Sequence, residues 1–509
     1  MRPNATIAAC VSGVLAGATF LAHVAEPSPP QQNHTDSLGV AELRSNRAGP
    51  NDSGLDPRNF GATGDGTADD WPAFQQAIDA AATLPNGGTV IIPSPPTGGS
   101  WRISQALRLR SRVTVRVVDP ATRIRCTGDP GTIDASGGMA NALAGWPTYG
   151  CVLFGSYTPA NIMQLSAADV MAPVAGSNSV TLASVANGDD YRSGDIVVIA
   201  SKPNFRIGKG PAAYFVPEWL QLDVVEDADA QTGTIWLREP IKRSLHAAEI
   251  RKLTNNGLSV LVEGVDTKVP MWATYGAALL GGTWEVPRGS THPFAAAGGA
   301  FGCQIAPDTV IAYTGVGYGN LVTACKISAR HETICGTPFE LAYGSHNNII
   351  NLGEINMEQS PPGAHPAPWV LGFDEGAHDN TLAVASVRLG NFSGDILRID
   401  RAAGNRVRVA TVQGGGITGF VVRVTSSNYA GTPPETAGNT IEIGTSELAS
   451  QNGYATIQGK STKDNHVIGR QFLGEIAHIP QLPFSVIDAG PNNTVPAASS
   501  SGYSSEVPH

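Results

Sequence analysis

Two aspartates occupy matching positions in the segments VLGFDEGAHDN and ILRIDRAAGN, each just after an alternating apolar strand and just before a turn. Asp374 and Asp400 are 26 residues apart. If each segment forms one layer of a repeating β structure, their carboxylates lie on neighbouring strands, roughly 4.8 Å apart. A retaining glycosidase requires two carboxyl groups about 5 Å apart, one as nucleophile and one as acid. The spacing therefore predicts that Asp374 and Asp400 hydrolyse a glycosidic bond.

Arginines occupy the positions beside these aspartates. In the same alignment, Arg398 and Arg423 share one outward column, and Gly372 leaves space above them. Guanidinium groups bind carboxylates and sulfates through paired hydrogen bonds. We therefore expect this column to hold an acidic sugar, with Arg398 close enough to take part in catalysis. The inward column consists of Phe373, Ile399, Val424 and Ile487, and the next position consists of Asp374, Asp400, Thr425 and Asp488.

Further side chains flank the same face. The candidate substrate-binding residues are Glu375, His378, Arg401, Trp369, Tyr343 and Arg423. Trp369 offers a flat ring on which a sugar can stack. A purely structural interpretation stays open, because an aspartate before a turn often bonds to the turn backbone and surface Asp–Arg pairs stabilise little. His378 lies two residues before a turn asparagine, which is typical of an ordinary turn residue. A register shift of one residue would exchange the inward and outward columns.

A second acidic cluster, in NFGATGDGTADDWPAFQQAIDAA, has a different local pattern. Asp65 lies in a glycine-rich turn, and Asp69 or Asp70 can start a helix whose first turn tolerates proline. The apolar residues that follow recur at helical spacing and form one face: Phe74, Ala77, Ile78 and Ala81. The runs GGTVIIP and RVTVRVV then alternate at the period of strands. The pattern predicts a short helix followed by strands.

Residues 59–117, from NFGATGDGTADD through GGTVIIP to VTVRV, resemble the N-terminal segment of the pectate-lyase-like superfamily of right-handed parallel β-helix proteins. The resemblance implies an all-β fold in which the helix caps the open end of the β-helix. It also implies that Asp65, Asp69 and Asp70 are structural rather than catalytic. Capping matters because an open end would expose unpaired strand edges.

The remaining chain repeats, as a β-helix requires. A turn asparagine followed by a strand of branched residues recurs at Asn348, Asn380, Asn405, Asn439, Asn465 and Asn493. In stacked layers these amides lie roughly 4.8 Å apart and can hydrogen-bond along the stack. Residues 165–250 differ, since NSVTLAS, GDIVVIA and GTIWLREPI alternate around short turns and indicate an antiparallel insertion or an elaborated early rung.

Composition places the chain among exported proteins. Residues 1–25 are apolar with a single arginine and indicate a secretory signal, so we expect a secreted or periplasmic protein without further membrane contact. A net charge of −10 argues against nucleic acid as a partner. The expected organisation is a signal at 1–25, a linker at 26–55, a single β-helix domain at 56–495 and a polar tail at 496–509. Within the β-helix domain we expect the cap and first strands at 56–125, the insertion at 165–250 and the main rungs at 251–495.

Cysteine usage predicts no metal site and no cofactor. Without Cys10, which the signal would remove, five cysteines remain, and an odd number cannot all pair. They are too scattered for a zinc site. We expect buried thiols with one disulfide at most, and no metal or cofactor is predicted.

The catalytic motifs of two relatives within the resembled superfamily are absent. The sequence lacks the Asn-Thr-Asp, Gly-His-Gly and Arg-Ile-Lys motifs of polygalacturonases and the Asp-His signature of calcium-dependent pectate lyases. The favoured function is hydrolysis of a polysaccharide bound along the β-helix groove. One alternative is a lyase acting on a uronate polymer, for which the resemblance implies Arg398 or Arg401 as base and Tyr343 as acid. The other is a non-catalytic, glycan-binding or structural surface protein. The sequence does not indicate an oligomeric state.

Overall fold

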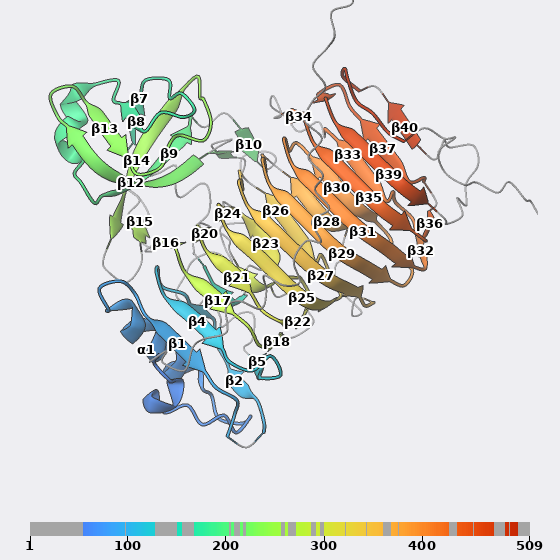
Figure 1. Cartoon of the computed structure of the whole chain (residues 1–509), viewed down its shortest axis with the longest axis horizontal. Helices are drawn as coiled ribbons and strands as arrows, with labels where there is room; N and C mark the ends of the chain where they lie inside the picture. Colours follow the sequence, from blue (N-terminus) through green and yellow to red (C-terminus); the bar gives the residue numbers. More distant parts are fainter. Residues whose placement is uncertain are drawn as a thin grey trace, which may run out of the picture. The chain divides into compact units, whose positions relative to one another are not determined.

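The computed structural model describes most of the chain after residue 53 (Figure 1). The described residues are 54–96, 98–127, 150–154, 167–202, 205–207, 214–216, 220–255, 260–262, 271–286, 292–295, 300–320, 322–342, 344–359, 368–374, 376–426, 435–450, 452–472, 484–487 and 489–496. The predicted signal, most of the predicted linker, almost all of the polar tail, Tyr343, Glu375 and Asp488 lie outside these ranges.

The chain forms a right-handed parallel β-helix, which confirms the expected fold. Strands one layer apart pair in parallel, so that each circuit of the chain, called a rung here, stacks on the previous one (Figure 1). Apolar side chains alternate with polar ones along these strands, and the apolar set fills the interior of the helix. Parallel strands joined by crossovers adopt this right-handed sense in nearly all known cases.

Two parallel sheets contain most of the rungs. The larger has fourteen described strands: β1 (Thr89–Ile92), β2 (Trp101–Ile103), β4 (Thr114–Val117), β5 (Arg123–Cys126), β17 (Ala278–Leu280), β18 (Thr283–Glu285), β21 (Gln304–Ala306), β22 (Thr309–Ala312), β25 (Lys326–Ile334), β27 (Ile349–Met357), β29 (Thr381–Leu389), β31 (Arg406–Gly414), β35 (Thr440–Ser446) and β39 (His466–Phe472). The smaller has seven: β23 (Gly317–Asn320), β26 (Phe339–Ala342), β28 (Trp369–Asp374), β30 (Asp395–Asp400), β33 (Val422–Thr425), β37 (Ala455–Gln458) and β40 (Phe484–Ile487).

Short strands complete the corners of the rungs. They are β3 (Leu107–Arg108), β6 (Gly150–Leu153) and β19 (His292–Ala295) in one sheet, β32 (Gly416–Ile417) with β36 (Ala449–Ser450), and β34 (Thr436–Ala437) with β38 (Thr462–Lys463). All three sets pair in parallel.

The turn asparagines form a continuous hydrogen-bonded stack, as their spacing predicts. From Asn348 to Asn465, each side-chain Nδ2 donates to the Oδ1 of the asparagine on the next rung, over 2.8 to 3.0 Å. Each backbone N–H donates to the same Oδ1, over 3.0 to 3.2 Å. We call this stack the asparagine ladder; its members are Asn348, Asn380, Asn405, Asn439, Asn465 and Asn493. The ladder fixes the start of the following strand on every rung from β27 to β39.

The N-terminal helix covers the first rung. A 3-10 turn, η2 (Pro57–Phe60), precedes α1 (Trp71–Ala82), which packs on β1 and β3. The helix buries the apolar face that its sequence predicts, including Phe74 and Ile78. Asp70 occupies the N-cap position but its carboxylate accepts the N–H of Thr63 at 2.7 Å instead of capping the helix. Asp65 accepts two N–H groups of its own turn. These contacts are local and structural.

Residues around the predicted insertion form antiparallel strands with a separate apolar core. They are β7 (Ala167–Val170), β8 (Ser179–Thr181), β9 (Ile196–Ser201), β12 (Leu220–Asp229), β13 (Thr234–Leu237) and β14 (Ala248–Asn255), with a 3-10 turn η3 (Val185–Asp190) and a hairpin of β10 (Phe205–Ile207) and β11 (Tyr214–Val216). The antiparallel β15 (Val260–Val262) and β16 (Met271–Tyr275) follow, and β16 then pairs in parallel with β20 (Ala300–Phe301) and β20 with β24 (Val322–Thr323).

The described part of the chain contains one disulfide and three buried thiols. Cys126 and Cys151 form a disulfide. Cys303, Cys325 and Cys335 are buried thiols. No described helix has both the length and the apolar character needed to cross a membrane.

Candidate functional site

The register predicted for the smaller sheet is confirmed over three rungs. Asp374 lies directly opposite Asp400, and Gly372 opposite Arg398. Arg398 in turn lies opposite Arg423 on β33. The alternation of each strand therefore brings these residues to one outward surface, which we call the arginine face. It comprises Glu340, Trp369, Gly372, Asp374, Arg398 and Arg423, together with Asp395 and Asp400 beneath them.

The register fails at the last rung. Val486 of β40, rather than Ile487, continues the inward column, and it does so through Ile457 of β37. Ile487 is paired with Gln458, one position further along. The alignment missed β37 altogether, because the turns around it differ in length from those of the earlier rungs.

The predicted catalytic aspartates differ strongly in exposure. The side chain of Asp400 is 1% exposed, whereas that of Asp374 is 16% exposed. Arg401, itself 2% exposed, donates from Nη2 to Oδ1 of Asp374 at 2.8 Å, and its Nε lies 3.7 Å from Asp400 Oδ2. A buried guanidinium therefore links the two carboxylates. A polymer can reach Asp374 but not Asp400 or Arg401.

Arg398 connects Asp400 to an aromatic ring. Its Nη2 lies 3.2 Å from Oδ2 of Asp400, and its guanidinium carbon lies 4.8 Å from the ring centre of Trp369. The indole covers Gly372, since a Cβ at that glycine would overlap the indole nitrogen. The space expected above Gly372 is thus filled by Trp369. Trp369 as a whole is partly exposed.

Arg423 repeats this arrangement one rung later. Its guanidinium carbon lies 4.9 Å from the ring centre of Phe420, and its Nε lies 3.4 Å from Oδ2 of Asp395. Asp395 also accepts the backbone N–H of Phe420 at 2.8 Å. Burial raises the pKa of Asp395, and the Phe420 N–H and the Arg423 charge oppose that rise. Each outward arginine is therefore stacked on an aromatic ring and paired with a buried aspartate.

The sequence analysis missed Glu340. This residue points outward from β26, is partly exposed, and lies directly opposite Gly372. A signal for it exists, because FELAYGSHNN precedes Asn348 as GFDEGAHDN precedes Asn380. Extending the alignment by one rung would have placed Glu340 in the column of Arg398. It is the second carboxylate of the arginine face that a polymer can reach.

His378 belongs to a corner of the rung rather than to the arginine face. It is 3% exposed, and its ring stacks on that of His346 with centres 4.7 Å apart. Its Nδ1 lies 2.8 Å from a carboxylate oxygen of Asp379. Burial, with a smaller contribution from His378, lowers the pKa of His346 well below its ordinary range. This position supports the interpretation as a turn residue.

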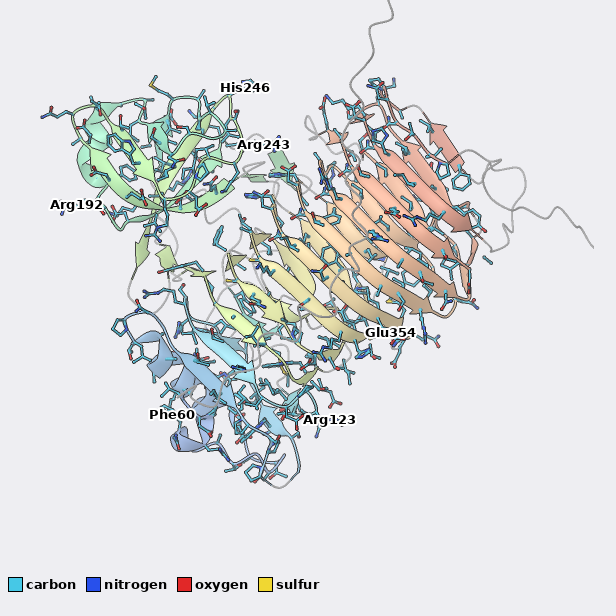
Figure 2. The ribbon with its side chains drawn as sticks, viewed as in Figure 1. Phe60, Arg123, Arg192, Arg243, His246 and Glu354 are labelled. Atoms are coloured by element: carbon cyan, nitrogen blue, oxygen red, sulfur yellow. A yellow bond between two sulfur atoms is a disulfide. The ribbon has the colours of Figure 1, made fainter. Side chains whose placement is uncertain are left out.

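Tyr343 and Glu375 lie outside the described residues. Glu354, labelled in Figure 2, belongs to β27 in the larger sheet, where it lies 3.3 Å from Arg388. Within the described ranges, no group of three or more histidine, cysteine, aspartate or glutamate side chains is placed to hold a metal ion.

Comparison with known proteins gives a short sequence match to a phage protein. No family model matches the chain. The tail spike protein of Shigella phage Sf6 is 36% identical over 67 residues, which are 13% of this chain and 11% of the tail spike protein. The chain thus matches only about a tenth of that relative's length.

Similar solved structures include phage tailspikes. The Pseudomonas phage phi297 tailspike gp61 is 12% identical, with 87% of this chain and 81% of that chain covered and a TM-score of 0.39. The Pseudomonas phage LKA1 tailspike gp49 is 14% identical, with 86% and 83% covered and a TM-score of 0.32. The Acinetobacter baumannii phage AP22 tailspike Gp54, solved with a capsular saccharide, is 10% identical, with 87% and 79% covered and a TM-score of 0.32. At these values the likenesses carry no argument about activity. The strand pairing itself shows that the chain has a right-handed parallel β-helix fold.

Proposed function

We propose that the protein is an exported glycoside hydrolase that cleaves a polysaccharide lying along the arginine face. The observation that carries this proposal is a pair of partly exposed carboxylates, Glu340 and Asp374, on neighbouring strands beside the Trp369 ring.

The spacing of this pair suits inversion rather than retention. Glu340 lies opposite Gly372, and Asp374 lies two residues further along the same face. Adjacent strands are roughly 4.8 Å apart and two residues span roughly 6.6 Å, so the two Cβ positions are separated by roughly 8 Å. Inverting glycosidases hold their carboxyl groups roughly 6.5 to 9.5 Å apart, which leaves room for a water molecule.

The two carboxylates would divide the reaction. Arg401 fixes the carboxylate of Asp374, which suits Asp374 to accept a proton from the attacking water. Glu340 would then protonate the leaving glycosidic oxygen. The Trp369 ring would hold the neighbouring sugar by stacking. This division replaces the predicted pair of Asp374 and Asp400, because Asp400 is too deeply buried to touch a substrate.

Product analysis tests the proposal. The purified chain is incubated with a panel of bacterial and plant polysaccharides, and products are identified by mass spectrometry and by NMR of the new anomeric centre. We expect fragments that have gained one water and have inverted configuration. Glu340→Gln and Asp374→Asn should each lower the rate at least about 100-fold, the usual contribution of a general acid or base.

A matched control separates these effects from a general loss of charge. Glu354→Gln removes a carboxylate from the larger sheet and should leave the rate unchanged. Fragments with unsaturated ends would favour the lyase alternative. Full activity of Glu340→Gln would contradict the proposed acid. Binding without cleavage across the panel would favour a non-catalytic glycan-binding protein.

A further inference from the structure

Among the residues that the structure describes, the arginine face has no excess positive charge. Three arginines are close to it, and each has an aspartate partner: Arg398 with Asp400, Arg401 with Asp374, and Arg423 with Asp395. Glu340 adds a negative charge to the same face. Polyanions bind where positive charge exceeds negative charge, and like charges repel them. The face therefore offers no net attraction to an acidic polymer.

Arg398 and Arg423 are each held in place by two contacts, one with an aromatic ring and one with a buried carboxylate. Arg398 and Arg423 are only 25% and 29% exposed, because each packs on an aromatic ring and reaches a buried carboxylate. A carboxylate of a sugar would compete with these buried partners for the guanidinium donors. Removing an arginine from such a partner would leave a buried charge without compensation, which is costly. The arginines act as supports for the rings.

From this balance we infer that the arginine face selects uncharged polysaccharide and excludes polyanionic chains. This inference rests on the proposed function, since it names the substrate class of that site. It reverses the expectation that Arg398 and Arg423 clamp an acidic sugar. The contacts that remain are stacking on the ring of the partly exposed Trp369 and hydrogen bonds to polar side chains, and both suit neutral hydroxylated sugars.

Asp395 provides a way to change the charge of the face without disturbing its shape. It is buried, and one oxygen accepts the Phe420 N–H while the other faces Arg423. Asp395→Asn keeps an oxygen for the Phe420 N–H and removes the negative charge. The Arg423 charge is then no longer balanced, and the face gains a positive charge.

The experiment compares two polymers that differ only in charge, polygalacturonate and its fully methyl-esterified form. Binding to the full-length chain is measured at low salt and near physiological salt, without reading cleavage. We expect the wild-type chain to bind polygalacturonate no more tightly than the ester. Asp395→Asn should bind polygalacturonate at least about tenfold more tightly than wild type does at low salt, and added salt should weaken this gain.

Two further variants locate the effect. Asp308→Asn removes a carboxylate that lies 3.3 Å from Arg330, away from the arginine face, and should give no gain. The double variant Asp395→Asn with Arg423→Gln should lose the gain. Tighter wild-type binding of polygalacturonate than of the ester would overturn the inference. So would the absence of any gain in Asp395→Asn. Failure of the hydrolase proposal would instead appear in the product analysis and would leave these binding results unchanged.

Discussion

The asparagine ladder and the arginine face cross the same rungs but are built in opposite ways. Every ladder position holds the same neutral amide, and from Asn348 to Asn465 each amide donates the same bond to the next asparagine. On the arginine face, the outward column changes from Glu340 through Gly372 to Arg398 and Arg423, and ends in hydroxyl residues. One column repeats and the other varies.

The difference separates what holds the rungs together from what could act on a ligand. A stack of identical amides satisfies every buried donor and acceptor, and any other residue there would leave some of them unpaired. The outward column faces no such demand, so its residues are free to differ. Repetition therefore marks the ladder as structural, and variation is consistent with the recognition that we propose for the arginine face.

The largest expected effect on stability comes from a substitution in the middle of the asparagine ladder. Asn405→Ala removes hydrogen bonds to the rungs on both sides, at Asn380 and Asn439, and leaves buried partners unpaired. We expect a loss of roughly 3 kcal/mol or more in the free energy of unfolding, since each unsatisfied buried group costs roughly 1 to 3 kcal/mol. Urea unfolding and amide exchange at β29, β31 and β35 measure it.

An exposed asparagine on the same rungs is the control for that variant. Asn351 lies on the outer surface of β27, so Asn351→Ala should change stability by less than about 0.5 kcal/mol. Equal losses in the two variants would remove the distinction between ladder and surface amides.

A buried carboxyl group in the larger sheet sharpens the comparison. It shows how an ionisable side chain, unlike the neutral amides of the ladder, behaves at a buried position. Glu332 on β25 lies between Val310 and Ile355, and one carboxyl oxygen accepts the Val316 N–H at 2.7 Å. Burial raises its pKa from 4.5 to about 7. The folded chain therefore binds this proton more tightly than the unfolded chain does.

The sign of the pH dependence follows. Protonation of Glu332 favours the folded state. The free energy of unfolding should therefore fall by about 3 kcal/mol in total as pH rises from about 4.5 to about 7, and then level off. Glu332→Gln should remove this dependence, whereas Glu354→Gln should keep it. Thermal unfolding between pH 4 and 8 measures the difference. A wild-type chain whose stability rises over this range would contradict the assignment.

The smallest expected effect concerns exposed ion pairs. Glu442 on β35 lies 2.6 Å from Arg470 and 3.8 Å from Arg408, and both arginine side chains are more than half exposed. Glu442→Gln should therefore cost less than about 1 kcal/mol. High salt should abolish the difference in urea unfolding. A loss as large as that of Asn405→Ala would mean that stability resides in surface charges rather than in the ladder.

The parts of the fold that depend on short-range alternation could be predicted from the sequence. Strand alternation and the turn asparagines suffice to place Asp374 opposite Asp400 and Arg398 opposite Arg423. The same signals fail where turns change length, as between β33 and β40, because a strand register can then slip by one residue without any local penalty.

The depth of the charged residues could not be predicted. Asp400 and Arg401 resemble surface residues in sequence, yet both are nearly fully buried. Arg401 adopts a backbone φ of 55°, a conformation that favours glycine or asparagine. An arginine at such a turn position gives no sign in the sequence that its side chain is buried. Mutual pairing makes the burial of both charges possible, and pairing across 27 residues is visible only once the rungs are stacked. For this reason the proposed pair of carboxylates contains Glu340 in place of Asp400.

The asparagine ladder also has a direction. From Asn348 to Asn465, each amide donates one N–H to the asparagine on the following rung and also donates to a backbone carbonyl of the preceding rung. The amide-to-amide bonds therefore all run one way along the helix axis. Hydrogen bonds in such a chain polarise one another, and each rung touches only its neighbours. The β-helix therefore behaves as a one-dimensional cooperative system. When the rung at one end unfolds, it weakens the amide hydrogen bond of the rung beside it, so unfolding proceeds from that end, one rung after another.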